Sequence, residues 1–180
     1  MAWKKLYVLG AGSYGKVYYA IKINSYELCA SVAAVKCADI RRSISLQQEV
    51  QILTTLKNCP YLVQFFGANV SIDDGNIPTY DLFLEYACGG SLHDLIINSK
   101  KKMTKPTNIL VFDNANECNM HKLKLANFGL SLKVGDGMAY MTGTPLSNRE
   151  TLLYAPPKSL TDGFHGKAYD IRSLGALWRR

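Results

Sequence analysis

Three glycines near the start of the chain have the spacing of a loop that holds phosphate groups. Gly10, Gly12 and Gly15 lie within Val8–Val17, which reads VLGAGSYGKV. Glycine lacks a Cβ, so the backbone N–H groups of such a loop can come close to phosphate oxygens. Glycine clusters are also common at ordinary turns, and the spacing alone is therefore weak evidence for phosphate binding.

A lysine in an apolar segment supplies the charge that such a loop would need. Lys36 ends the run Ser31–Lys36, which reads SVAAVK, and a lysine in that setting requires an anionic partner. The segment Lys16–Ile23 is β-branched and aromatic, where a dinucleotide-binding βαβ unit would need a helix. The sequence therefore predicts three strands between residues 3 and 37, joined first by a glycine-rich hairpin whose tip lies over phosphates.

A helix and further strands must hold these groups in place. Apolar residues at positions 46, 50, 53 and 56 predict a helix over residues 43–57, with Ser43 or Ser45 as its N-cap. Glu49 lies beside this apolar stripe, a position where a glutamate is usually solvated. Hydrophobic runs predict four more strands, over 61–67, 80–86, 109–111 and 123–125.

The order of these motifs resembles that of a protein kinase domain. The glycine pattern followed by Ala34-Val-Lys36 is the opening of such a domain, and Lys105-Pro-Thr-Asn108 and Asn127-Phe-Gly129 match two later motifs. The lysine-proline form of the loop is of the serine/threonine type. Three stretches are most similar to the mitogen-activated protein kinase kinase kinase group of plants: Trp3–Gly10, Cys59–Val63 and Phe83–Leu92.

The resemblance covers the chain from Trp3 to about Arg180 and implies an α+β fold of two lobes. Residues 1–86 would form a five-stranded antiparallel N-lobe with one helix, and residues 87–180 a hinge and an incomplete, mainly helical C-lobe. Between Asn98 and Lys105 the chain has no room for the long buried helix of the family. We therefore expect the second lobe to be truncated.

The resemblance also implies an ATP site. Lys36 would neutralise the phosphates while Glu49 holds it in place. Val17 and Ala34 would cover the adenine ring, Leu84 would lie behind it, and the backbone of Glu85 to Ala87 would bond its edge. The implied nucleotide-binding residues are thus Gly10, Gly12, Gly15, Val17, Ala34, Lys36, Leu84, Glu85 and Ala87.

The catalytic motifs depart from the family pattern. Lys105 and Asn108 match the end of the catalytic loop, but Met103 stands at the position of the catalytic aspartate and Lys101 at that of the histidine. Asn127 replaces the aspartate that binds magnesium. Hard cations prefer carboxylates, so Asn108 and Asn127 would bind magnesium weakly.

Whether the chain is an enzyme stays open at this point. Lys36, Glu49 and Lys105 are the catalytic residues that the resemblance preserves, but a missing general base lowers a rate by about 10²–10⁴-fold. We expect an ATP-binding, catalytically impaired domain of the pseudokinase type. The alternatives are a module that only binds a partner and a degenerate kinase fragment without a stable function.

The composition of the chain limits the classes of molecule that it is expected to bind. The chain has 180 residues, a net charge of +7 and 48% hydrophobic residues, which is typical of a globular domain. Its basic runs lack interleaved aromatic residues, so nucleic-acid binding is not expected. Five cysteines show no metal-binding spacing, and no segment is long and apolar enough to cross a membrane. We expect a cytoplasmic protein whose partners are ATP and a protein substrate or partner kinase.

Overall fold

The structure is a computed structural model of the chain. It describes residues 2–12, 15–23, 31–73, 75–98, 108–113, 121–129, 131, 139–140, 164–165 and 170–171. The chain divides into two compact units, one of Met1–Leu95 with Thr107–Ser131 and one of Ile96–Pro106 with Leu132–Arg180. The lobe boundary expected at residue 86 stays a prediction.

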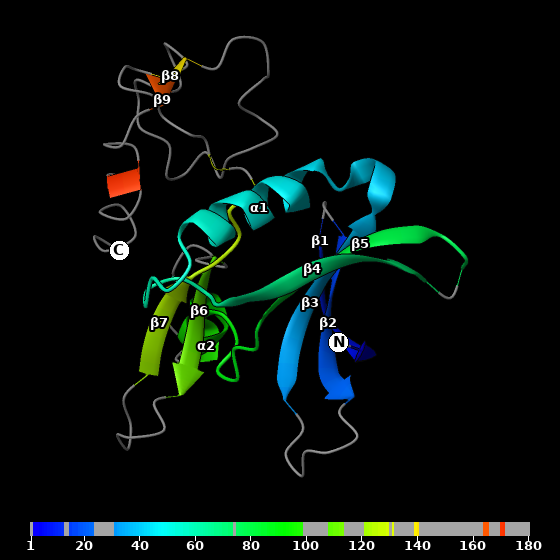
Figure 1. The fold of residues 1–180 in the computed structure, drawn as a ribbon. Coiled ribbons are helices and arrows are strands. Elements are labelled where there is room, and N and C mark those ends of the chain that lie inside the picture. The colour runs from blue at the N-terminus through cyan, green and yellow to red at the C-terminus, as the bar shows by residue number, and fades with distance from the viewer. Residues whose placement is uncertain are drawn as a thin grey trace. The chain divides into compact units, whose positions relative to one another are not determined.

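An antiparallel sheet of five strands dominates the first unit (Figure 1). Its strands follow the order β1-β2-β3-β5-β4, so that β5 lies between β3 and β4. They comprise β1 (Ala2–Gly12), β2 (Gly15–Ile23), β3 (Val32–Asp39), β4 (Phe65–Ile72) and β5 (Pro78–Glu85). This sheet and its one accompanying helix confirm the architecture that was expected for the N-lobe.

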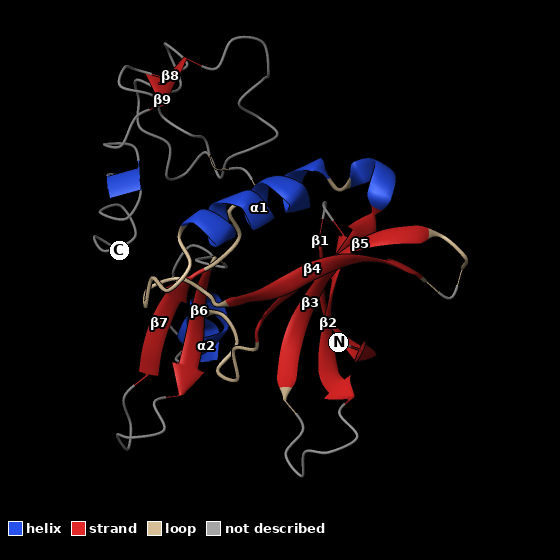
Figure 2. Ribbon diagram, viewed as in Figure 1, coloured by secondary structure: helices blue, strands red, loops and turns tan. Residues whose placement is uncertain are grey.

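Helix α1 (Ile44–Thr55) lies along one face of the sheet (Figure 2), and its apolar stripe packs in one cluster with Leu82 and Leu84 of β5. Leu46 and Leu53 are buried. Ser43 occupies the N-cap position, as predicted, although its hydroxyl donates to the carbonyl of Ile40 instead of capping the helix. The helix ends before Leu56, and that side chain, which the stripe predicted to be apolar and packed, is 47% exposed.

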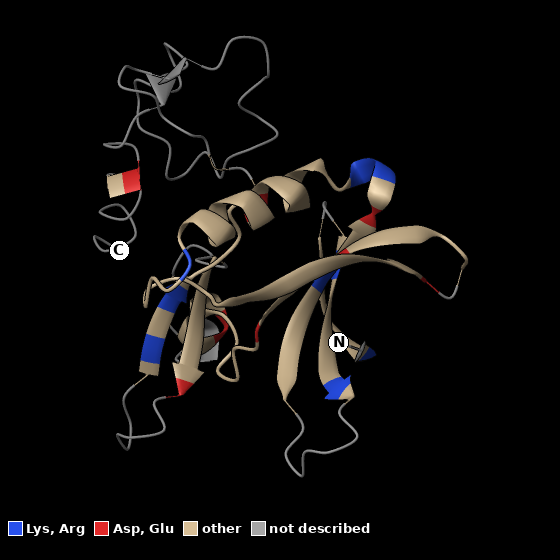
Figure 3. Cartoon of the chain, viewed as in Figure 1, with Lys and Arg blue, Asp and Glu red and all other residues tan. Residues whose placement is uncertain are grey.

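A short 3-10 helix, η1 (Ile40–Arg42), connects β3 to α1. Asp39 caps it by accepting from the backbone N–H of Arg41 at 2.9 Å, and the Arg41 guanidinium pairs with the same carboxylate at 2.8 Å. The hydrogen bonds from Arg41 hold the pKa of Asp39 at about 2. In Figure 3 acidic and basic residues follow one another along the ribbon at this turn.

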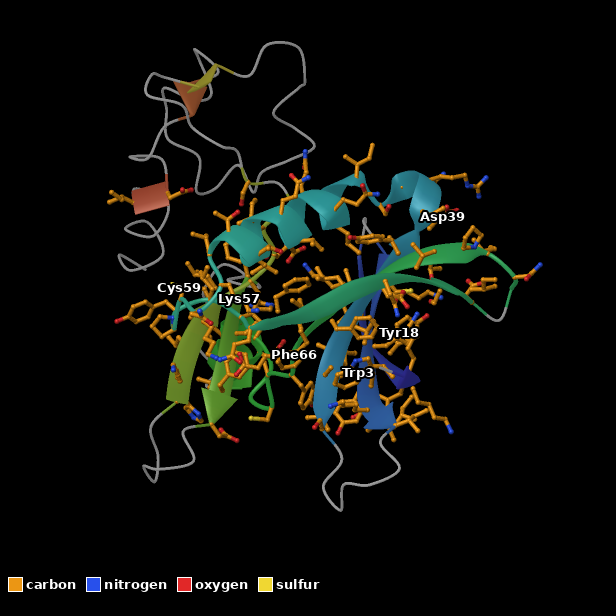
Figure 4. All side chains as sticks on the ribbon, viewed as in Figure 1. Trp3, Tyr18, Asp39, Lys57, Cys59 and Phe66 are labelled. Atoms are coloured by element: carbon orange, nitrogen blue, oxygen red, sulfur yellow. The ribbon has the colours of Figure 1, made fainter. Side chains whose placement is uncertain are left out.

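The two faces of the sheet carry separate clusters of apolar side chains. Alternation along β5 places Leu82 and Leu84 in the cluster that contains Leu53, whereas Phe83 belongs to the other cluster. The Trp3 ring stacks 5.7 Å from that of Phe83. Figure 4 shows Trp3, together with Tyr18 and Phe66, on the side of the sheet away from α1.

A second, two-stranded sheet completes the first unit. It consists of β6 (Ile109–Asp113) and β7 (His121–Leu125), and helix α2 (Leu92–Asn98) precedes it in the chain. The strand predicted over 61–67 is wrong in its position, because β4 begins only at Phe65 and runs to Ile72. The physical reason is that the segment before Phe65 bonds elsewhere: the N–H of Val63 donates to Leu125 at 2.9 Å.

The described part of the second unit is small. Strands β8 (Ala139–Tyr140) and β9 (Phe164–His165) pair with each other, and residues 170–171 are helical. Lys105, Met103 and most of the predicted activation segment lie outside the described residues. No helix within the described ranges is both long and apolar enough to span a membrane.

The glycine hairpin itself allows a stability prediction. Gly15 has a φ of +133°, and a Cβ built on it would lie 2.1 Å from the carbonyl oxygen of Cys37. We expect Gly15→Ala to lower the free energy of unfolding by about 2 kcal/mol or more, from backbone strain and overpacking. A Cβ at Gly10 meets nothing within 4 Å, so Gly10→Ala is the matched control. Equal urea midpoints for both variants would contradict the prediction.

Candidate functional site

A cavity of about 600 Å³ lies in the first unit, within the range of about 300–1,000 Å³ that small-molecule sites occupy. The glycine hairpin contributes Gly10, Gly12 and Gly15 to its lining, and the neighbouring strand positions Val17 and Ala34 line it as well. Its polar lining residues include Lys36, Glu49, Asn108 and Asn127, and Ala87 lines it as well. The structure thus brings together ten of the predicted site residues.

Two predicted nucleotide-binding residues, Leu84 and Glu85, are absent from the cavity lining. Leu84 is 4% exposed and packs in the core cluster. The carboxylate of Glu85 accepts from Lys124 Nζ at 2.5 and 2.8 Å, and from the backbone N–H of Gln64 at 3.2 Å. The Glu85 side chain therefore connects the end of β5 to β7.

Lys36 and Glu49 form the main ion pair of the cavity. Lys36 Nζ lies 2.9 Å from Oε1 and 2.8 Å from Oε2 of Glu49, whose side chain is 1% exposed, against 20% for Lys36. Strand β3 positions the lysine. Glu49 reaches it because it lies on the face of α1 that also buries Leu46 and Leu53. The pair puts one ammonium group at a fixed point on the cavity wall.

A chain of side-chain hydrogen bonds continues from this pair. Lys36 Nζ donates to Asn127 Oδ1 at 3.2 Å, and Asn127 Nδ2 donates to Asn108 Oδ1 at 2.9 Å. The lysine ammonium can only donate, so the amide oxygen of Asn127 must face it and the NH₂ group must face Asn108. Asn127 has a φ of +68°, a left-handed conformation that asparagine tolerates better than most residues.

Comparison with known proteins decides the family. The family model for protein tyrosine and serine/threonine kinases matches residues 4–146, well over half of the chain. The chain belongs to this kinase family.

Three similar relatives are mitogen-activated protein kinase kinase kinases, which confirms the group that the motifs resembled. Mitogen-activated protein kinase kinase kinase 20 of Arabidopsis thaliana is 26% identical over 97% of this chain and 57% of its own length. Mitogen-activated protein kinase kinase kinase 17 of the same plant is 36% identical over 52% of this chain and 24% of its own length. Mitogen-activated protein kinase kinase kinase 4 of Homo sapiens is 28% identical over 97% of this chain and 12% of its own length. The chain thus spans 57% of the first relative and less of the other two.

Kinases of this family use ATP and magnesium, and the described residues fit these two groups unequally. The glycine hairpin and Lys36 fit phosphates. No group of three or more His, Cys, Asp or Glu side chains that could hold a metal occurs in the part of the chain that the structure describes.

Several cavity residues were missed by the sequence analysis. Leu9, Leu110 and Ala126 add apolar surface, and Cys88 and Asp94 lie at the lining as well. Leu9 directly precedes the first glycine, and Leu110 alternates with Asn108 along a predicted strand, so both could have been inferred from strand periodicity. The sequence around Asp94, Ser91-Leu-His-Asp-Leu95, indicates only the start of a helix and does not predict that this residue lines a cavity.

Asp94 caps the first turn of α2. Its carboxylate accepts from the N–H of Ser91 at 3.0 Å and from the Ser91 hydroxyl at 2.6 Å, and that hydroxyl accepts from the N–H of Asp94 at 3.2 Å. The hydrogen bond from the Ser91 side chain lowers the pKa of Asp94 below its ordinary value of 3.8. The stability that this cap contributes is therefore present above that value and is lost as the pH falls further.

Replacing Asp94 by alanine tests the cap. We expect Asp94→Ala to lower the free energy of unfolding by about 1 kcal/mol at pH 7, as loss of an exposed helix cap does. The difference from the unmodified chain should shrink below pH 4, because the carboxylate becomes protonated there. Urea unfolding at pH 7 and pH 3 measures both values. A difference that stays constant over this range would contradict the assignment of Asp94 as a charged cap.

Proposed function

We propose that this domain binds an adenine nucleotide in the cavity and transfers phosphoryl groups very slowly or not at all. The observation that carries the proposal is the Lys36–Glu49 pair, which holds an ammonium group on the wall of a cavity lined by Gly10, Gly12 and Gly15. In the kinase family this arrangement neutralises the phosphates. It would serve binding whether or not catalysis follows.

The apolar part of the cavity suits an adenine ring. Val17 and Ala34 line it from β2 and β3, and Leu110 lines it from β6. Ala87 lines it directly after β5, where the kinase family bonds the adenine edge through the backbone. A flat aromatic base between aliphatic side chains, with backbone groups at its edge, is the arrangement that these residues support.

Two residues, Met103 and Asn127, are expected to make phosphoryl transfer slow. Met103 stands where the family has the aspartate that accepts the substrate proton, and methionine cannot act as a base. Asn127 stands where the family has a metal-binding aspartate, and it brings no negative charge. Phosphoryl transfer depends on a positioned base and on metal ions that neutralise developing charge, so both losses act on the same step.

From the similar kinases we also propose a cellular location and a type of protein partner. A domain derived from a mitogen-activated protein kinase kinase kinase would act in the cytoplasm, in contact with a protein of such a cascade. Cys37, Cys59 and Cys88 are free thiols among the described cysteines, which suits a reducing compartment. The protein partner would bind this domain as a regulator or scaffold, because the domain itself is a poor catalyst.

Thermal unfolding with and without ATP tests the binding part. ATP at 100 times its dissociation constant should stabilise the chain by about 2.7 kcal/mol and raise the Tm accordingly. Inorganic triphosphate at the same concentration is the control, and it should raise the Tm less because it lacks the base. An unchanged Tm at millimolar ATP, with a cooperative transition, would contradict nucleotide binding.

A phosphotransfer assay tests the catalytic part. With labelled ATP and a general protein substrate, we expect a rate at least about 100-fold below that of an intact kinase, since the general base is missing. The Met103→Asp variant is the informative comparison, because it restores the residue type of the family at one position. A rate for the unmodified chain close to that of an intact kinase would overturn the proposal of weak catalysis.

A further inference from the structure

We propose that the cavity binds its adenine nucleotide without a divalent cation, and that Asn127 is the residue that determines this. The inference rests on the proposed nucleotide site and adds the chemical form of the ligand: free ADP or ATP instead of the magnesium complex. Three features of the described residues support it. These are the hydrogen bonds of the two asparagine amides, the pairing of the cavity carboxylates, and the positive charge that faces the ligand.

Both amide oxygens that a cation could use are already engaged. Asn127 Oδ1 accepts from Lys36 Nζ at 3.2 Å, and Asn108 Oδ1 accepts from Asn127 Nδ2 at 2.9 Å. A cation at Asn127 Oδ1 would also lie beside a positively charged ammonium group. The same contacts fix the orientation of both amides, because reversing Asn127 would point its NH₂ group at the donor-only ammonium of Lys36.

The carboxylates that line the cavity are engaged as well. Both oxygens of Glu49 accept from Lys36, and one oxygen of Asp94 accepts two hydrogen bonds from Ser91. Magnesium requires nearly octahedral oxygen coordination and is usually bound through one or two carboxylates. Among the described lining residues, therefore, no acidic side chain outside these pairs is available to hold the ion.

The positive charge of the cavity can replace the cation. Lys36 and Lys16 are both lining residues of the cavity, and Lys16 is exposed. Asn127 is neutral, so it does not repel a phosphate group that binds beside Lys36. A carboxylate at the same place would repel the phosphates unless a cation lay between them. The asparagine removes that repulsion, and with it the need for the cation.

Calorimetric titration of the full chain with ADP, in chelator and in 5 mM magnesium at equal ionic strength, tests the inference. We expect magnesium to leave the dissociation constant unchanged within about twofold or to raise it, since magnesium competes for the phosphates. Asn127→Asp should weaken binding in chelator at least about tenfold, through repulsion between carboxylate and phosphates. Magnesium should restore most of that loss in the variant.

Asn76→Asp is the matched control. Asn76 is exposed in the turn between β4 and β5, has a φ of +58°, and is absent from the cavity lining. It receives the same change of charge at a similar backbone conformation, and its titration should match that of the unmodified chain in both buffers. Circular dichroism melting of both variants identifies any failure to fold.

The outcomes separate the inference from the function on which it rests. Magnesium strengthening ADP binding to the unmodified chain tenfold or more would overturn the inference and leave the nucleotide site standing. Binding without magnesium, together with an Asn127→Asp variant that shows no magnesium dependence, would overturn the role of Asn127. No binding heat in either buffer would overturn the proposed nucleotide site itself. If Asn127→Asp does not fold, the titrations of the unmodified chain still decide the first point.

Discussion

Replacing Lys36 by methionine is expected to abolish the rise in Tm with ATP and to lower the free energy of unfolding by about 3 kcal/mol. The carboxylate of Glu49 is 1% exposed, and Lys36 supplies two of its hydrogen bonds, at 2.8 and 2.9 Å. Removing one partner of a buried ion pair costs about 3–5 kcal/mol because the other charge stays buried. The ligand loses its phosphate contact at the same time.

A double variant separates these two effects. Replacing both members of a buried ion pair by apolar residues is often neutral for stability. Lys36→Met combined with Glu49→Met should therefore recover most of the lost stability in urea unfolding while ATP still fails to raise the Tm. Lys57→Met, at an exposed position after α1, is the control and should change neither value. Recovery of the ATP effect in the double variant would show that Lys36 does not contact the nucleotide.

Replacing Asp81 by alanine is the second large expected effect. The carboxylate is buried in the sheet, where Lys5 Nζ pairs with it at 2.6 Å, the hydroxyl of Ser71 donates to it at 2.6 Å and the thiol of Cys37 at 2.8 Å. Burial, and then the bond to Asp81, raises the pKa of Cys37, so the thiol stays protonated as a donor. The hydroxyl of Thr79 donates to the same carboxylate at 3.3 Å. We expect a loss of about 3 kcal/mol, because four donors lose their acceptor together.

An exposed aspartate on a strand supplies the control. Asp113 pairs with His121 at 3.4 Å, and both side chains are at least half exposed. We expect Asp113→Ala to change the free energy of unfolding by less than about 1 kcal/mol. Chemical denaturation of both variants gives the two values. A loss for Asp81→Ala as small as that for Asp113→Ala would contradict a stabilising role for the buried network.

The first three strands and the helix could be predicted because their signals are local. The β-branched run before Lys36 and the spacing of Leu46 and Leu53 report directly on strand and helix periodicity. The position of β4 could not be predicted in this way. Leu62 and Val63 are as apolar as strand residues, but their backbone bonds to Leu125, which is distant in the sequence.

Part of the site could be inferred from motifs and part of it could not. The proximity of Lys36 and Glu49 followed from the resemblance, because the motif carries both residues. The amide contact between Asn108 and Asn127 did not, since it depends on how the ends of β6 and β7 approach each other. The pairing of Glu85 with Lys124 is a similar case: the motif placed Glu85 next to the adenine but carried no information about its side-chain partner.

A titration of the isotope-labelled full chain with ATP in chelator, followed through its backbone amide NMR signals, tests the nucleotide site most directly. We expect the largest chemical-shift changes at Gly10, Gly12 and Ala87, which line the cavity, and none at Val70 or Asn76, which do not. Changes confined to residues outside the cavity, or no change at millimolar ATP, would contradict the account.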